Sequence, residues 1–311
     1  MPDAAVPPPA PRGRSGTGWF AVVLVVGTIL ATVGGPAIGR GVLHASDTLQ
    51  LEAPWKADAP HGFSPRNSAT SDTVDATVPV RVEWSRRVRA GDLPLWTELQ
   101  AGGAPLAALP NASAFSPLSV AWYLVPAWYA PAVTKLLEMA VAALFTFLLV
   151  RRLGAGRLAA GIAAVAFAGS GFQVVWTNWP HTHVAALAPA LLWAVDRAQA
   201  RGRAVDLVPI ALVSASMWFE GFPAVALWAH LLAGVFALVR ALAATEPRIR
   251  PGDLAARARM TGQGRRLLVP LGGVVLGAML AAVQLLPFAS RLGELDLAYR
   301  AEKVGPLPWR A

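Results

Sequence analysis

Two aspartates in one short polar stretch have the residue type and the spacing for acid–base chemistry. The stretch reads Asn67-Ser68-Ala69-Thr70-Ser71-Asp72-Thr73-Val74-Asp75. Side chains three residues apart share a face of a helix, so Asp72 and Asp75 would lie side by side if this segment is helical. A carboxylate so placed can remove a proton from a hydroxyl group. The alternative is structural, with Ser71 or Asp72 serving only as the N-cap of a helix.

A second group of polar and aromatic side chains occurs later in the chain, within one short segment. Its members are Trp176, Asn178, Trp179, His181 and His183. Two histidines two residues apart can contribute to a metal site, but no third ligand is evident, so we expect no metal. The segment would instead contact a sugar or a lipid carrier, or anchor the chain at a membrane interface. Glu220, in a tight turn, is either a further polar contact in the same cavity or a solvated turn residue.

Basic side chains on the same side of the chain could meet the negative charge of a phosphate group. The candidates are Arg81, Arg86, Arg87, Arg89 and Arg291. The alternative for each is an ordinary arginine in contact with water or lipid headgroups. The chain has no cysteine, which excludes a thiol nucleophile and a thiolate metal site. It also contains no phosphate-binding glycine loop, no His-Glu-x-x-His motif and no nucleophile elbow, and we expect no cofactor.

These residues stand in a chain whose composition is that of a membrane protein. Of the 311 residues, 55% are hydrophobic and 14% are charged, whereas a typical soluble domain has about 25% charged residues. The formal net charge of +9 by itself suggests nucleic-acid binding. The arginines cluster between apolar runs, however, as topology signals do. We therefore expect a lipid bilayer, and no nucleic acid, as the partner of this chain.

The apolar runs predict an all-α polytopic membrane protein with about seven transmembrane helices. The runs cover residues 19–39, 130–150, 158–176, 184–195, 205–219, 223–239 and 267–288. The first run is longer than the apolar part of a cleaved signal peptide, which favours an uncleaved anchor. The two shortest runs would be tilted, thin the bilayer locally or form a re-entrant pair. Residues 1–18 are predicted to be a disordered cytoplasmic tail, and residues 19–311 a transmembrane domain that is truncated at its C-terminus.

Arginines between the runs predict the orientation of the chain in the membrane. Three arginine-rich segments would face the cytoplasm together with the N-terminus, whereas the short segments 177–183 and 220–222 contain no Lys or Arg. The arginine-rich segments carry Arg151, Arg152 and Arg157, then Arg197, Arg201 and Arg203, then Arg240, Arg248, Arg250, Arg257, Arg259, Arg265 and Arg266. We therefore expect a multi-pass protein of the bacterial cytoplasmic (inner) membrane, with Asp72, His181 and Glu220 on the outer face.

The longest segment between apolar runs, residues 40–129, is predicted to be an outside loop. Valines recur near helical spacing within residues 73–89, which predicts an amphipathic helix on the membrane surface. They are Val74, Val78, Val82 and Val88. Pro79 would kink this helix or start a new turn. The end of the loop has aromatic residues typical of an interfacial belt. They are Trp122, Tyr123, Trp128 and Tyr129.

Polar residues inside the apolar runs are costly in a membrane and usually have partners. Lys135 and Glu138, three residues apart near the outer end of the second run, are expected to pair with each other. His230 in the sixth run is expected to donate a hydrogen bond between packed helices. The glycines of Gly169-Ser170-Gly171 are expected to permit close helix packing.

Several motifs, taken in their order along the chain, resemble the YfhO-type family of bacterial membrane proteins. They are Ser71-Asp72-Thr73 with Pro79, Arg89-Ala90-Gly91-Asp92-Leu93-Pro94-Leu95-Trp96, Gly102-Gly103-Ala104-Pro105, Phe115-Ser116-Pro117, Ala166-Phe167-Ala168-Gly169-Ser170-Gly171, Trp179-Pro180-His181 and Gln284-Leu285-Leu286-Pro287. The resemblance covers most of the chain from about residue 47 onward. It implies a GT-C-like fold, the fold of glycosyltransferases whose first outside loop carries a catalytic acid, and Asp72 is the matching position. Asp75 stands where the family pattern is often amide-like, and no Asp-Asp or Asp-Glu dipeptide is present here.

The resemblance implies an inverting, metal-independent membrane glycosyltransferase. Its donor would be a polyprenyl-phosphate sugar, and its acceptor a cell-envelope glycan or lipid. Asp72 would be the catalytic base, with Asp75 in support. The substrate-binding residues would be Arg81, Trp179, His181, His183, Glu220 and Arg291. Independently of the resemblance, the arginine count places Asp72, residues 179–183 and Glu220 on one membrane face, so we expect them to border one outward cavity. The alternatives are a lipid-linked sugar flippase or transporter, and a non-catalytic membrane assembly protein.

Overall fold

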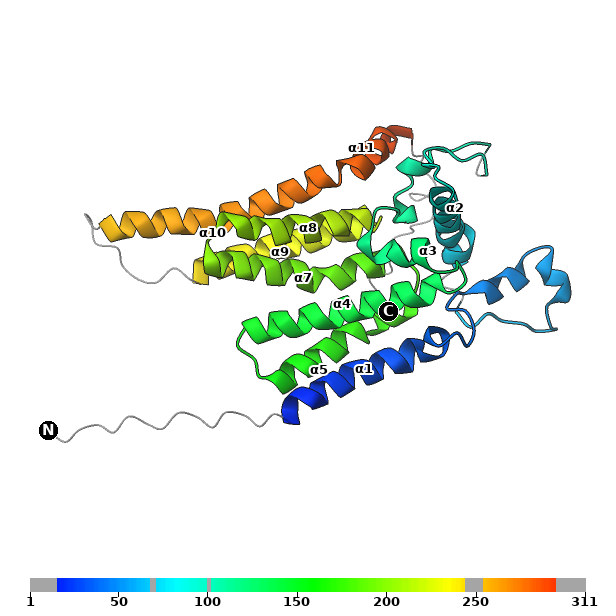
Figure 1. The fold of residues 1–311 in the computed structure, drawn as a ribbon, viewed down its shortest axis with the longest axis horizontal. Coiled ribbons are helices and arrows are strands. Elements are labelled where there is room, and N and C mark those ends of the chain that lie inside the picture. The colour runs from blue at the N-terminus through cyan, green and yellow to red at the C-terminus, as the bar shows by residue number, and fades with distance from the viewer. Residues whose placement is uncertain (1–15, 68–70, 100–101, 244–253, 295–311) are drawn as a thin grey trace, which may run out of the picture.

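The computed structural model describes residues 16–67, 71–99, 102–243 and 254–294, and within these residues the fold is all-α. Long helices run roughly alongside one another in an elongated bundle, and the segment between α1 and α4 closes one end of it (Figure 1). Most of the expected N-terminal tail lies outside the described residues. Helix α1 begins at Gly16, slightly before the predicted start of the first apolar run.

Helices occupy all of the apolar runs, and several extend beyond them. They are α1 (Gly16–Ala37), α4 (Ala130–Arg152), α5 (Arg157–Ala168), α6 (Gly171–Val175), α7 (Pro180–Arg201), α8 (Leu207–Phe219), α9 (Pro223–Ala243), α10 (Leu254–Leu280) and α11 (Ala282–Ser290). Helix α7 is longer than the run predicted because Pro180 starts it and Gly202 ends it in the left-handed conformation, with φ of 64°. Helix α10 begins at Leu254, so part of the predicted arginine-rich loop is helical.

The described helices include three that are long and apolar enough to cross a membrane, or four if one bent pair forms a single span. The three are Ala130–Arg152, Arg157–Val175 and Pro223–Ala243. The bent pair joins residues 266–280 to residues 282–290 at an angle of 68°. Helices α1 and α8 contribute shorter apolar segments, 22–37 and 204–219. The chain is therefore a multi-pass membrane protein in composition and helix length, with fewer clear spans than the predicted seven.

Glycines allow two pairs of helices to approach closely. A Cβ atom at Gly277 of α10 would lie 2.5 Å from Cβ of Ser214 on α8, and one at Gly273 would lie 2.7 Å from Cβ of Ile210. A Cβ at Gly169, at the end of α5, would lie 2.7 Å from Cγ2 of Thr28 on α1. Because helices in a membrane gain stability from close packing, these contacts explain why small residues stand there.

Residues 40–129 lie over the end of the bundle, and we call them the cap. The described ones, 40–67, 71–99 and 102–129, form short helices joined by turns. The elements of the cap are the 3-10 helices Ser46–Leu51, Trp55–Asp58, Leu106–Ala108, Pro110–Ala112 and Pro117–Ser119, the π-helix Thr73–Thr77, and the α-helices α2 (Val78–Arg89) and α3 (Val120–Leu124). Pro79 lies in the first turn of α2, as expected for a proline that starts a new helical turn. A single antiparallel bridge joins Thr97 to Ala104.

The buried face of α2 agrees only in part with the one that its valines predict, because Val78 and Val82 pack, partly buried, against an apolar cluster of the cap. Val80, Arg81, Trp84 and Ser85 are buried, whereas Val88 is exposed. The predicted interfacial belt is corrected at Trp122 of α3, which is buried in an apolar cluster with Ala121 and Ala130, whereas Trp128 is exposed. Both corrections have the same cause: the cap packs on the bundle and on itself, and the side that is covered decides which residues are buried.

Arginines and aspartates join the helices at the end opposite the cap. Asp196 of α7 accepts hydrogen bonds of 2.7 Å from Arg152 of α4 and from Arg240 of α9. Asp206, before α8, pairs with Arg197 at 3.3 Å. These arginines therefore gather at one end of the molecule, as the topology argument requires, and the cap lies at the other.

Candidate functional site

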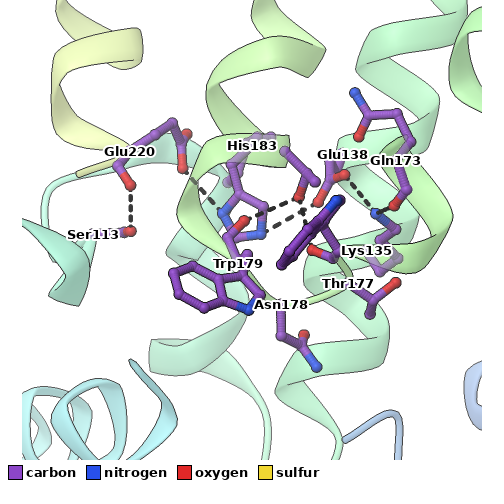
Figure 2. Close-up of polar contacts among 12 residues, drawn as sticks. Ser113, Lys135, Glu138, Gln173, Thr177, Asn178, Trp179, His183 and Glu220 are labelled. Atoms are coloured by element: carbon purple, nitrogen blue, oxygen red, sulfur yellow. Dashed lines mark hydrogen bonds and ion pairs between the residues drawn. The ribbon is translucent and has the colours of Figure 1, made fainter. Parts of the chain in front are cut away.

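A cluster of charged side chains is buried where the cap meets the helix bundle. Its members are Arg81, Lys135, Glu138, His183 and Glu220, and we call it the inner cluster. None is more than 2% exposed. Charged residues are almost never fully buried unless they have partners, so this concentration is the most unusual feature of the described interior. Figure 2 shows four of these residues with the polar groups that surround them.

Four separate parts of the chain bring the inner cluster together. Lys135 and Glu138 lie one turn apart near the start of α4, and His183 lies in the first turn of α7. Glu220 lies in the turn between α8 and α9, where Gly221 adopts a positive φ of 86° that favours glycine. Arg81 enters from α2 of the cap.

The contacts within the bundle form a continuous row of ionisable groups. Lys135 Nζ lies 2.6 Å from Glu138 Oε1, which confirms the predicted pairing. Glu138 Oε2 lies 3.2 Å from His183 Nε2, and His183 Nδ1 lies 3.3 Å from Glu220 Oε2. Lys135 also donates to the backbone oxygen of Gln173 on α6. The row therefore runs from Lys135 to Glu220 across α4, α7 and the α8–α9 turn.

Hydroxyl groups of the cap continue this row. Ser113 Oγ donates to the backbone oxygen of Glu220 at 2.7 Å and accepts from Arg81 Nη2 at 3.0 Å. Ser116 Oγ donates to Glu220 Oε1. The guanidinium of Arg81 lies over the ring of Trp122, 5.9 Å from its centroid. Glu220 is thus one of the residues at which the cap and the bundle are joined.

Burial perturbs the groups at this junction. Burial raises the pKa of the Glu220 carboxyl to about 8, although the hydrogen bond from Ser116 and the charge of Arg81 act against the increase. Burial also lowers the pKa of the Arg81 guanidinium to about 10, and Glu220 and Glu138 partly offset this. Arg81 is therefore a buried cation inside the protein, and not an arginine in contact with water or lipid headgroups.

Asp72 and Asp75 are exposed and lie on the surface of the cap. Asp72 stands at the N-cap of the π-helix without a side-chain capping bond to the described residues. Asp75 lines a hollow of about 270 Å³ together with Ser71, Thr48 and Glu52. The structure therefore presents both carboxylates to solvent and leaves them out of the inner cluster. Glu220 and His183 do meet, but both are buried, so they do not border an open cavity with Asp72.

His181 and Trp179 belong to an aromatic packing group beside the inner cluster. The ring centroid of His181 lies 5.2 Å from those of Trp176 and Trp179, and 5.3 Å from those of Phe172 and Phe222. Within the described part of the chain, no group of three or more His, Asp or Glu side chains is placed to hold a metal ion. His181 and Trp179 pack among aromatic rings, and their roles in sugar contact or interfacial anchoring stay predictions.

The other candidate arginines have partners at the protein surface. Arg86 pairs with Glu83 at 2.8 Å, and Arg87 pairs with Asp92. Arg89 donates to the backbone oxygens of Trp122, Tyr123 and Val125, which ends the short helix α3. Arg291 is partly buried just after α11 and likewise has an interaction. Arg87 and Arg89 thus join α2 to other parts of the cap, whereas Arg86 pairs within α2.

A second, larger hollow of about 520 Å³ lies between the cap and the turn before α7. Its lining includes His44, Asp47, Asn67 and Asn178. Asn178 donates to the backbone oxygen of Leu43 at 2.7 Å, and Asn67 donates to that of Val175 at 2.9 Å. These two amides fasten the start of the cap to the bundle.

Some residues of the site were not singled out from the sequence. Ser113, Ser116 and Gln173 give no sign of a role by type or spacing, although Ser116 stands in one of the motifs quoted above. His230, by contrast, makes the expected interhelical hydrogen bond, since its Nε2 lies 2.8 Å from Ser214 Oγ. The expected donor role is corrected, because Nδ1 lies 2.6 Å from the backbone oxygen of Ala226 and carries the N–H, so Nε2 of the neutral ring accepts from Ser214. Comparison of the chain with protein-family models, with curated proteins and with solved structures finds no match.

Proposed function

We propose that this protein is a membrane glycosyltransferase that moves a sugar from a polyprenyl-phosphate carrier to a cell-envelope glycan or lipid. In this proposal the chain has about seven spans in a GT-C-like arrangement. The N-terminus and the arginine-rich end face the cytoplasm, and the cap faces the outside of a bacterial cytoplasmic membrane.

The observation that carries the proposal is the position of the cap. It folds over one end of the bundle and exposes Asp72 and Asp75 there, and Asp75 lines a hollow that is open to solvent. An acceptor hydroxyl can approach a carboxylate on such a surface from the water side. A lipid-linked donor can reach the same end from the bilayer. The resemblance of this segment to the YfhO-type motifs supports the same assignment.

The chemistry requires little from the protein. Asp72 removes the proton of the acceptor hydroxyl, whose oxygen then attacks the anomeric carbon of the donor sugar. The new C–O bond forms as the bond from that carbon to the phosphate breaks, and the polyprenyl phosphate leaves with both electrons. A phosphate leaving group needs little protonation, so a single carboxylate base is the minimum equipment.

The test is transfer of a labelled sugar in membranes that contain the polyprenyl donor. Asp72→Asn should lower transfer by about 10²–10⁴-fold, while Asp75→Asn should weaken it less. Asn caps a helix about as well as Asp, so a purely structural Asp72 would tolerate the change. Asp58→Asn, at another exposed carboxylate of the cap, is the matched control and should leave transfer unchanged. Full activity of Asp72→Asn would remove this residue from the mechanism, and absence of transfer by the unmodified chain would reject the function.

Transport of a lipid-linked sugar is the second candidate, and two observations favour it. Helices α10 and α11 form a bent pair, and the inner cluster places ionisable groups inside the bundle. Broken helices and buried ionisable groups are typical of transporters. Translocation of a fluorescent lipid-linked sugar across proteoliposomes, without covalent transfer, would favour this candidate over the transferase.

A further inference from the structure

His183 lies between two buried glutamates, with one carboxyl group near each nitrogen of its ring (Figure 2). The gap from Nε2 to Glu138 Oε2 is 3.2 Å, and the gap from Nδ1 to Glu220 Oε2 is 3.3 Å. All three side chains are at most 1% exposed. Since water does not cover them, their polar atoms have to satisfy one another.

Three of the four atoms that face one another across these gaps have no other hydrogen-bond partner among the described residues. Glu138 Oε2, His183 Nδ1 and Glu220 Oε2 are all in this state. A neutral imidazole has one N–H and one acceptor nitrogen, so it can donate across only one gap. The other gap needs a proton from a carboxyl group. We propose that Glu138, His183 and Glu220 form an internal proton-binding site, in which one proton rests on Glu220 and can pass through the imidazole to Glu138.

The transfer conserves atoms and charge. In the resting arrangement, Glu220 O–H donates to His183 Nδ1, and His183 Nε2–H donates to the Glu138 carboxylate. Transfer breaks the O–H bond on Glu220 and forms an N–H bond at Nδ1. At the same time the N–H bond at Nε2 breaks and an O–H bond forms on Glu138. The imidazole is neutral before and after, and only its tautomer changes.

A cation stands at each end of this chain of groups. Lys135 lies 2.6 Å from Glu138 and stabilises its carboxylate in the resting arrangement. Arg81 acts on Glu220 from the cap and stabilises the carboxylate that transfer would leave there. Both arrangements therefore place a positive charge near the ionised carboxylate. For this reason the proton can occupy either of the two positions.

The other ionisable groups near the site do not move the resting position of the proton away from Glu220. His181 lies two residues before His183 on α7 and is packed among aromatic rings. Tyr123 of α3 lies close enough to interact with Arg81. Ser116 donates to the second carboxyl oxygen of Glu220, which suits the carbonyl oxygen of a protonated acid. The raised pKa of Glu220, about 8 because of burial, agrees with a proton held there at neutral pH.

This site does not depend on the transferase proposal, because Asp72 and Asp75 lie outside it. Infrared spectroscopy of the full chain in lipid vesicles tests it directly, since a protonated carboxyl group has a C=O band that a carboxylate lacks. The unmodified protein should show a buried carboxyl band at neutral pH. The band should disappear with a midpoint near the pKa of about 8 as the pH rises. A protein without this band at neutral pH overturns the proposal.

Three variants assign the band. Glu220→Gln should remove it, and Glu138→Gln should retain it, because the proton rests on Glu220. Asp206→Asn, at a buried carboxylate near the other end of the bundle, is the matched control and should also retain it. A band that survives in Glu220→Gln overturns the assignment. If Glu220→Gln does not fold, the midpoint of the unmodified protein still decides, since an ordinary carboxyl group titrates near pH 4 to about 4.5.

Discussion

Replacing Glu138 with glutamine should destabilise the folded bundle much more than the same replacement at Glu220. Glu138 is the ionised partner of Lys135, whose ammonium is 1% exposed and lies 2.6 Å from its carboxylate. Glu138→Gln leaves that ammonium buried with neutral acceptors only. Removing one partner of a buried ion pair typically costs about 3–5 kcal/mol.

Glu220→Gln imitates the protonated carboxyl group. The amide oxygen can accept from Ser116, and the amide N–H can donate to His183 Nδ1, as the acid does in the proposed resting state. At neutral pH the loss should not exceed about 1 kcal/mol, and a gain offsets it because the amide, unlike Glu220, takes up no proton when the chain folds. The difference between the two variants should therefore be at least about 2 kcal/mol, or roughly a 30-fold change in the unfolding equilibrium.

Reversible unfolding in mixed detergent micelles, followed by tryptophan fluorescence, measures this difference. Circular dichroism controls for helix content. The double variant Lys135→Met with Glu138→Gln removes both charges and should recover part of the loss, because no buried ion is left without a counter-ion. The reasoning is refuted if Glu220→Gln costs as much as Glu138→Gln, since Glu220 would then be ionised in the folded state.

Three further outcomes test other parts of the structure by the same unfolding measurement. The pKa of Glu220 in the folded state is raised from 4.5 to about 8, so the folded state keeps a proton that the unfolded state loses. The free energy of unfolding should therefore fall by up to about 1.4 kcal/mol per pH unit as the pH rises between these values. Glu220→Gln should flatten this slope between about pH 6 and about pH 8, and an unchanged slope would contradict the assignment. Asp196→Asn, which weakens two hydrogen bonds of 2.7 Å to arginines on neighbouring helices, should cost about 1–3 kcal/mol; no loss would mean that these surface-facing arginines contribute little. Gly277→Ala should cost about 1–3 kcal/mol by overpacking against Ser214, whereas Gly272→Ala, with open space around it, should be neutral or stabilising; equal effects would show that α8 and α10 do not pack as described.

The positions of the helices follow closely from the sequence. Apolar runs of suitable length require helices in a membrane, since a backbone surrounded by lipid has to satisfy its own hydrogen bonds. The Lys135–Glu138 pair could be predicted equally well from the sequence, because side chains three residues apart on one helix meet whatever surrounds that helix. Local spacing was sufficient in both cases.

The inner cluster could be predicted from the sequence only in part. Arg81, His183 and Glu220 were each candidates by residue type, and the arginine count placed the last two around one cavity, but nothing in the sequence indicates that all three are buried together. The sequence also did not determine which of the candidate residues are buried. The sequence places Asp72 and Glu220 alike in polar segments on one face, yet Asp72 is exposed and Glu220 is fully buried.

The reason is that burial depends on what covers a residue. The valines of α2 describe an amphipathic helix, but the surface that the cap packs against decides that Arg81 and Trp84 face inward and Val88 outward. The chain by itself determined the helices, the arginine-rich end and one local ion pair. Only the tertiary structure determined that His183 meets Glu220 inside the bundle and that the cap adds Arg81 to them, because long-range desolvation and charge pairing arise from contacts that the order of residues does not encode locally.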